Sequence, residues 1–131
     1  MTPETVRDAM VPEPTTVDAD ASAQEAGRCF ADNDVRAIFV TESDGQLLGV
    51  VTRKTLVREV VAAGRDPRVV TLREIAEPPH FTLDAGQGLD RAYHFLEEQD
   101  LERVPVVEEN RLVGVLSRAV VQRRLAEDEA L

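Results

Sequence analysis

The chain has 131 residues, of which 43% are hydrophobic and 31% charged, and its formal net charge at pH 7 is −10. These values are typical of a globular protein, and the acidic charge repels phosphate backbones and anionic lipid, so no nucleic acid and no membrane is expected as a partner. A single cysteine, Cys29, and an opening without an apolar leader favour a cytoplasmic protein.

The first half of the chain predicts a β-α-β-β-α unit. In chain order the elements are a strand at 16–19, an amphipathic helix with the apolar stripe Ala23, Ala26, Gly27 and Phe30, a strand at 36–40, a turn at 43–46, a strand at 47–52, and a helix marked by Leu56, Val57, Val60 and Val61.

The second half repeats the same template 65 to 67 positions later. Residues 72–75 align with 6–9. The apolar stripe Leu89, Ala92, Tyr93 and Leu96 repeats that of the first helix at an offset of 66. Strands are predicted at 103–107, aligned with 36–40, and at 112–117, aligned with 47–52. Val121 and Leu125 mark a weaker second helix, followed by an acidic tail that is expected to fray.

Residues 62–67 end the first half with helix-stopping and turn residues. This linker is too short to tether two independent domains, so we expect one module of two repeats, at 1–66 and 67–131.

The duplicated β-α-β-β-α order, with an Arg-x-Pro-Val-Val strand at 103–107 and Gly-to-Thr/Ser strand ends at 49–52 and 114–117, resembles a tandem pair of CBS domains. The resemblance implies an α/β (α+β) fold of two CBS repeats related by pseudo-twofold symmetry, with two clefts between them. It also implies frequent homodimers, and adenosine-containing ligands such as AMP, ADP, ATP or S-adenosylmethionine in some members.

Thr52 and Ser117 stand where a strand meets a helix, with Arg53 and Arg118 directly after them. One interpretation is that each hydroxyl caps its helix. The other is that the helix start, the hydroxyl and the arginine bind a phosphate. Both interpretations remain open at this point.

Nucleotide-binding CBS proteins typically carry an aspartate three positions after this Ser/Thr, and here those positions are Thr55 and Val120. Losing that charge-assisted hydrogen bond is worth roughly tenfold to a hundredfold in affinity. Thr55 offers a neutral hydrogen bond, so we expect the first cleft to be the better site and nucleotide affinity to be weak.

The remaining candidate ligand-binding residues lie in or beside the first and second predicted strands of each half. They are Thr16, Arg36, His80, Thr82 and Arg103. For the two arginines the alternative is a surface ion pair with a neighbouring carboxylate, from Asp34, Asp100 or Glu102.

These patterns favour a regulatory module that senses an adenosine-type small molecule in the inter-repeat cleft and relays its state to an unidentified effector. The alternative is a degenerate pair that serves dimerisation or scaffolding without a ligand. No catalytic residue is expected, because the sequence has no nucleophile motif and Cys29 lacks a neighbouring histidine. His80 and His94 show no metal-ligand spacing, so no metal is expected.

Overall fold

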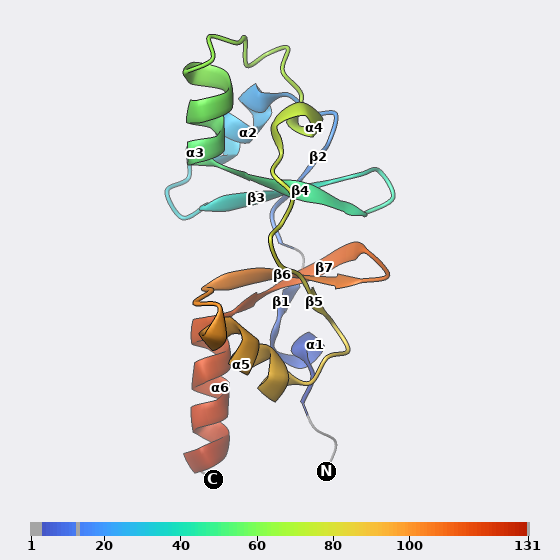
Figure 1. Cartoon of the computed structure of the whole chain (residues 1–131), viewed down its shortest axis with the longest axis vertical. Helices are drawn as coiled ribbons and strands as arrows, with labels where there is room; N and C mark the ends of the chain where they lie inside the picture. Colours follow the sequence, from blue (N-terminus) through green and yellow to red (C-terminus); the bar gives the residue numbers. More distant parts are fainter. Residues whose placement is uncertain (1–3, 13, 131) are drawn as a thin grey trace. The chain divides into compact units, whose positions relative to one another are not determined.

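The structure is a computed structural model that describes residues 4–12 and 14–130, without the side chains of 128–130 (Figure 1). Its contacts divide the chain into two compact units. Unit 2 is the continuous segment Thr15–Pro79, and unit 1 combines the residues before it with those after it.

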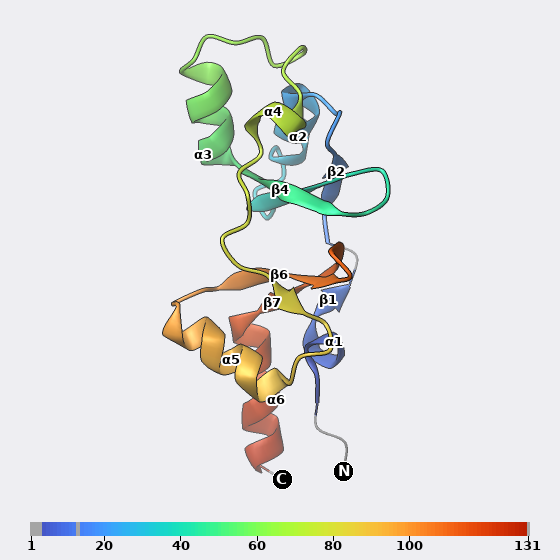
Figure 2. The same cartoon turned by 45° about the vertical axis from the view of Figure 1, so that its right-hand side comes forward.

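Unit 2 is a three-stranded sheet with helices on one face (Figures 1 and 2). The sheet order is β2-β3-β4, in which β2 is parallel to β3 and β3 antiparallel to β4. In chain order the elements are β2 (Thr16–Asp18), α2 (Ala23–Cys29), β3 (Ala37–Thr41), β4 (Leu47–Thr52), α3 (Arg53–Leu56), the π-helix η1 (Val57–Val61) and α4 (Leu72–Ile75).

Unit 1 repeats this arrangement with one additional edge strand. Its sheet order is β1-β7-β6-β5. The elements are α1 (Val6–Ala9), β1 (Val11–Pro12), β5 (Leu83–Asp84), α5 (Leu89–Glu98), β6 (Arg103–Glu108), β7 (Arg111–Ser117) and α6 (Arg118–Ala130). The mixed α/β class and the duplicated β-α-β-β-α order are thus confirmed. The α6 helix extends into the acidic tail as far as Ala130.

Each unit has its own apolar core between its sheet and its helices. The core of unit 2 includes Ile38, Val51 and Leu72, and that of unit 1 includes Val6, Leu89 and Leu116. The α1 helix therefore packs in unit 1, whose strands β5, β6 and β7 come from the second sequence repeat, and α4 packs in unit 2, whose strands come from the first. The sequence repeats and the compact units are offset, since each repeat supplies its leading segment to the unit built by the other.

The strand register corrects the alignment of the repeats by one residue. Ala37 is paired with Thr52 and Arg103 with Ser117, so Arg103 corresponds to Ala37, at an offset of 66. The alignment of 36–40 with 103–107 was therefore wrong by one position. Because side chains alternate between the faces of a strand, Arg36 and Arg103 are not equivalent residues.

The second helix of unit 2 also differs from the prediction. After one α-turn the chain forms a π-helix, in which Val60 is 3% exposed but Val57 is 56% and Val61 is 71% exposed. The wider turn brings only part of the predicted apolar stripe to the core. In unit 1, Val121 is fully buried.

We call 6–12 and 72–77 the exchanged segments. Each passes over a strand of the sheet in its unit at a glycine of that strand. In unit 2 the backbone of Glu77 pairs with that of Val50, with N···O distances of 2.8 and 3.0 Å. A Cβ added at Gly49 would lie 2.6 Å from the carbonyl oxygen of Glu77. In unit 1 a Cβ added at Gly114 would lie 2.8 Å from the carbonyl oxygen of Val11. Both glycines are therefore required by close backbone approach.

We predict that Gly49→Ala destabilises the protein by about 1–3 kcal/mol, because the added methyl group overlaps a backbone atom. Gly27→Ala is the matched control, since that position is helical with open space around it, and it should instead stabilise by about 0.5–1 kcal/mol. Urea unfolding of both variants checks the prediction. An unchanged midpoint for Gly49→Ala would contradict it.

Ion pairs hold both exchanged helices at equivalent positions. Arg73 in α4 contacts Glu42 at 2.5 Å, and Arg7 in α1 contacts Glu108 at 2.6 Å, 66 residues apart in both partners. The hydrogen bond from the Arg73 guanidinium lowers the pKa of Glu42 below its ordinary value. The Thr71 backbone N–H, with Arg65, lowers the pKa of Glu74 in the same way.

Since folding depresses the pKa of Glu42, its contribution to stability is present above the ordinary glutamate pKa and lost as the pH falls through the folded value. We predict that Glu42→Gln is less stable than the wild type at pH 7, and that the difference narrows below about pH 4. Urea unfolding across this range measures the difference. Exposed Glu109 is the control position, where Glu109→Gln should give no comparable trend.

Candidate functional site

The predicted residues of unit 2 gather at one end of its sheet. Thr16 is paired with Phe39, and Thr52 with Ala37 two residues earlier on β3, so both threonines lie at the same end of the sheet on either side of β3. Arg36 directly precedes β3 at this end and is exposed. The register therefore brings Thr16, Arg36 and Thr52 to the same end of the sheet.

The Thr52 and Thr55 hydroxyls are engaged with each other. Thr52 Oγ1 accepts a hydrogen bond from the Thr55 backbone N–H at 3.3 Å, and Thr55 Oγ1 accepts one from the Thr52 N–H at 3.1 Å. The two hydroxyl oxygens are 3.1 Å apart. Thr55 is also 1% exposed. The pair forms a capping box at the start of α3, which is the capping interpretation of Thr52.

Arg53 completes the end of the preceding helix. Its Nη2 donates to the carbonyl oxygens of Phe30 and Asp32 at 2.9 and 3.0 Å. Its guanidinium also lies over the Phe30 ring, 5.1 Å from the centroid. Helix ends leave carbonyl groups without intrahelical partners, and Arg53 satisfies that of Phe30, the residue at the C-terminal cap of α2. This use of Arg53 does not follow from the sequence, because the stripe containing Phe30 predicts only core packing.

At the corresponding end of the sheet in unit 1, the side chains make different contacts from those in unit 2. Arg103 is paired with Ser117, and Thr82 directly precedes β5, whose Leu83 is paired with Val106. Arg103 is exposed, and among the described side chains of 4–12 and 14–127 no ion pair or hydrogen bond of its guanidinium is found. The part of the chain that the structure describes likewise shows no hydrogen bond of the Ser117 hydroxyl.

Arg118, and not Arg103, forms the ion pairs with Asp100 and Glu102. Its guanidinium contacts Asp100 at 3.3 Å and Glu102 at 3.2 Å. Arg118 thus anchors the connection after α5, much as Arg53 anchors the one after α2. Asp34 forms no ion pair with Arg36 among the described residues. The surface ion pairs that were the alternative for Arg36 and Arg103 are therefore absent from the described part of the chain.

His80 and Thr82 are both exposed on the segment that enters β5. The next residue after His80, Phe81, packs edge-on against Phe95 with ring centroids 5.2 Å apart. This contact holds residues 80–82 at the end of the sheet where Arg103 and Ser117 lie.

Within the described residues, no group of three or more His, Cys, Asp or Glu side chains is arranged to hold a metal ion. His94 contacts Glu98 one helical turn away. No helix in the described ranges is long and apolar enough to cross a bilayer.

The duplicated fold agrees with the result of a comparison with known protein families. The CBS domain model matches residues 6–62 and 72–127. The chain belongs to the CBS domain family. The two matches confirm the tandem CBS pair inferred from the repeat.

Individual CBS proteins support this assignment along almost the whole chain. Hypoxic response protein 1 of Mycobacterium tuberculosis is 32% identical over 123 residues, which are 94% of this chain and 86% of the relative. A crystal structure of Hypoxic Response Protein I with two coordinated zinc ions has a TM-score of 0.78 at 30% identity, covering 92% of this chain and 98% of that one.

Two more distant CBS structures share the fold. CBSX2 in complex with AMP has a TM-score of 0.75 at 22% identity and covers 95% of this chain and 98% of its own. The CBS domain pair of protein MJ0100, in complex with 5-methylthioadenosine and S-adenosyl-L-methionine, has a TM-score of 0.70 at 20% identity, with 97% and 99% covered.

We predict that Arg53→Met destabilises this CBS pair by about 1–2 kcal/mol, because the Phe30 carbonyl loses the Arg53 hydrogen bond, the Asp32 carbonyl keeps only that of the Val35 N–H, and the cation–π contact is lost. Arg118→Met removes ion pairs with the exposed carboxylates of Asp100 and Glu102 and should cost less than about 1 kcal/mol. Chemical denaturation of the two variants measures the contrast. Equal losses would contradict the structural role assigned to Arg53.

Proposed function

We propose that this CBS pair is a regulatory module that binds an adenosine-type nucleotide or related small molecule and relays its state to a partner protein. The proposed role is regulatory and not enzymatic, in the cytoplasm. AMP, ADP, ATP and S-adenosylmethionine are the ligands to test first, since related CBS structures contain AMP or S-adenosyl-L-methionine.

The observation that carries the proposal is the pairing of Arg103 with Ser117 at the start of α6. The guanidinium has no ion pair within the described residues, and a 13-residue helix begins directly after the hydroxyl. A helix start presents backbone N–H groups and a positive dipole end, which favour a phosphate or carboxylate. Thr82 and His80 lie on the adjoining segment and would contact the remainder of the ligand.

These contacts favour unit 1 over unit 2, the reverse of the order expected from Thr55. In unit 2 the hydroxyls of Thr52 and Thr55 bind each other and Arg53 binds backbone carbonyls. A ligand there would have to displace these bonds. In unit 1 the hydroxyl and the arginine are available, although Val120 offers no hydrogen bond to a ribose. The proposed affinity is therefore modest and is dominated by the anionic group.

We predict that millimolar AMP or ATP raises the melting temperature, because a ligand selective for the folded state stabilises it. Arg103→Gln should weaken binding roughly tenfold to a hundredfold, since a charge-assisted hydrogen bond is lost. Titration calorimetry measures both affinities. Thr52→Ala is the matched control, which should cost about 1 kcal/mol of stability through its cap but leave the affinity unchanged.

The absence of a shift with every adenosine ligand would contradict this function. The second candidate, a dimerisation or scaffolding module without ligand, would then be preferred. A specific observation supports it, namely the exposure of Val57 and Val61 on η1. We propose a homodimer under either candidate, since exposed apolar side chains on one helix face are typical of an interface.

A further inference from the structure

The segment that leads into the sheet is held in different ways in the two units. In unit 2, Thr15 directly precedes β2, and its carbonyl oxygen accepts a hydrogen bond from the Phe39 N–H at 3.2 Å. Counting 66 positions on, the equivalent residues of unit 1 are Phe81 and Pro105. Proline has no backbone N–H, so this hydrogen bond cannot form in unit 1. The parallel strand pairing of unit 1 accordingly starts one residue later than that of unit 2, at Leu83.

An aromatic contact holds the entry segment of unit 1 instead. Among the described residues, no backbone hydrogen bond of 78–82 is found. The ring of Phe81 packs edge-on against that of Phe95, on α5, with 5.2 Å between the centroids and an interplanar angle of 77°. Phe95 in turn packs against the buried core of unit 1. The two rings therefore join the entry segment to the core.

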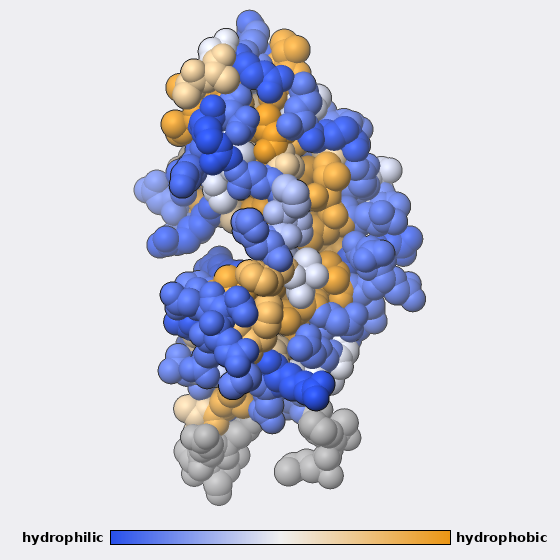
Figure 3. Space-filling view, viewed as in Figure 1, coloured by the Kyte–Doolittle hydropathy of each residue, from blue (hydrophilic) through white to orange (hydrophobic). Residues whose placement is uncertain are grey.

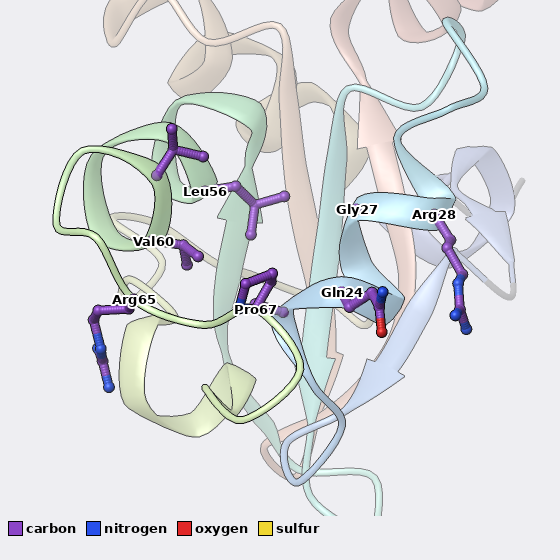
Figure 4. Close-up of a pocket in the computed structure, with 9 residues that line it drawn as sticks. Gln24, Gly27, Arg28, Leu56, Val60, Arg65 and Pro67 are labelled. Carbon is purple, nitrogen blue, oxygen red and sulfur yellow. The ribbon is translucent and has the colours of Figure 1, made fainter.

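The first helix of unit 2 has small side chains at the positions of the α5 rings. Cys29 stands where unit 1 has Phe95, and Gly27 stands where it has Tyr93, both at an offset of 66. The small side chains of α2 leave an open groove of about 470 Å³ between α2 and the α3–η1 helix (Figure 4). The aromatic contact of unit 1 therefore has no counterpart at the equivalent positions of unit 2.

The candidate ligand residues of unit 1 lie on the face of the sheet away from its core. Val104 and Leu116 are paired across β6 and β7, and both are buried in the core. Side chains alternate between the two faces of a strand, so the next pair, Arg103 and Ser117, lies on the opposite face. An anionic ligand bound by this pair would lie on that face.

Phe81 determines the direction of the residue that follows it. The rings of Phe81 and Phe95 are in contact, and Leu83 is buried in the core, so Thr82 between them turns to the face of Arg103. Phe81 itself is 36% exposed, and Figure 3 shows hydrophobic side chains reaching the surface of unit 1 among hydrophilic ones. The contact thus lies at the edge of the core, where it can be altered without removing the core itself.

We propose that Phe95 is a positioning residue for the ligand site of unit 1. Its ring holds Phe81 on the core side, and Phe81 thereby keeps Thr82 and the exposed His80 beside the face of Arg103. The inference rests on the ligand-binding function proposed above and adds a residue that does not itself contact the ligand. Without the ring, residues 80–82 would take the binding arrangement only part of the time, and the apparent affinity would fall in proportion.

The first test is Phe95→Leu, which keeps an apolar side chain against the core but removes the ring. Titration calorimetry with AMP should show roughly threefold to tenfold weaker binding than the wild type, since the contact between the rings is lost. Tyr93→Leu is the matched control, because Tyr93 lies on the same helix and packs against the same core. It should lose comparable stability and keep the affinity of the wild type.

A second background separates positioning from simple destabilisation. Pro105→Val restores the N–H donor that Phe39 provides in unit 2, so the Phe81 carbonyl can again be held by a hydrogen bond. In the Pro105→Val background, Phe95→Leu should therefore cost little affinity. A loss caused only by a weakened core would be the same in both backgrounds.

Backbone amide order parameters of the ligand-free protein follow the segment itself. The values at Phe81 and Thr82 should fall in Phe95→Leu and stay unchanged in Tyr93→Leu. Three outcomes would overturn the inference: an unchanged AMP affinity in Phe95→Leu, an equal loss of affinity in both backgrounds, or unchanged order parameters. A wild type that binds no adenosine ligand would instead contradict the proposed function, and the order parameters would then decide whether Phe95 holds the segment.

Discussion

The close approach of two backbones at Gly49 and Gly114 is the constraint on which the rest of the structure depends. At each glycine an exchanged segment crosses a strand at a distance that no other residue permits. Val6 and Leu72, one on each exchanged segment, then become core residues of the unit they enter. Capping boxes at Thr5 and Thr71, and the ion pairs of Arg7 and Arg73, hold the segments in equivalent ways. The strand ends that carry the candidate site are thereby fixed within complete cores.

Much of the fold followed from the sequence because apolar periodicity and the internal repeat are local signals. The exchange of 6–12 and 72–77 did not, since contacts between distant segments leave no periodic trace. The clue was present in the match of 6–9 with 72–75, together with the paired glycines. The alignment of Arg36 with Arg103 failed because both arginines precede apolar runs, and only the hydrogen-bond register reveals a shift of one residue.

The candidate site shows a second limit of sequence interpretation. Residue types identified Thr52, Arg53, Ser117 and Arg118 correctly as the residues at the strand-to-helix junctions. They did not show which polar groups already have partners. Thr55, at the position of the aspartate found in nucleotide-binding relatives, forms a reciprocal cap with Thr52, and Arg53 binds backbone carbonyls at the end of α2. Arg103 emerged as the stronger ligand candidate only once the described residues left it without an ion pair.

The exchange of leading segments has a consequence for how such a chain arose. A single repeat, on its own, would have an incomplete core and an uncovered strand beside its glycine. It would become complete only by accepting the leading segment of a second identical molecule and giving its own in return. Duplication and fusion into one polypeptide would turn that mutual association into an intramolecular one, with a far higher effective concentration. The two halves were then free to diverge, so that Arg53 now binds backbone carbonyls while Arg118 pairs with carboxylates.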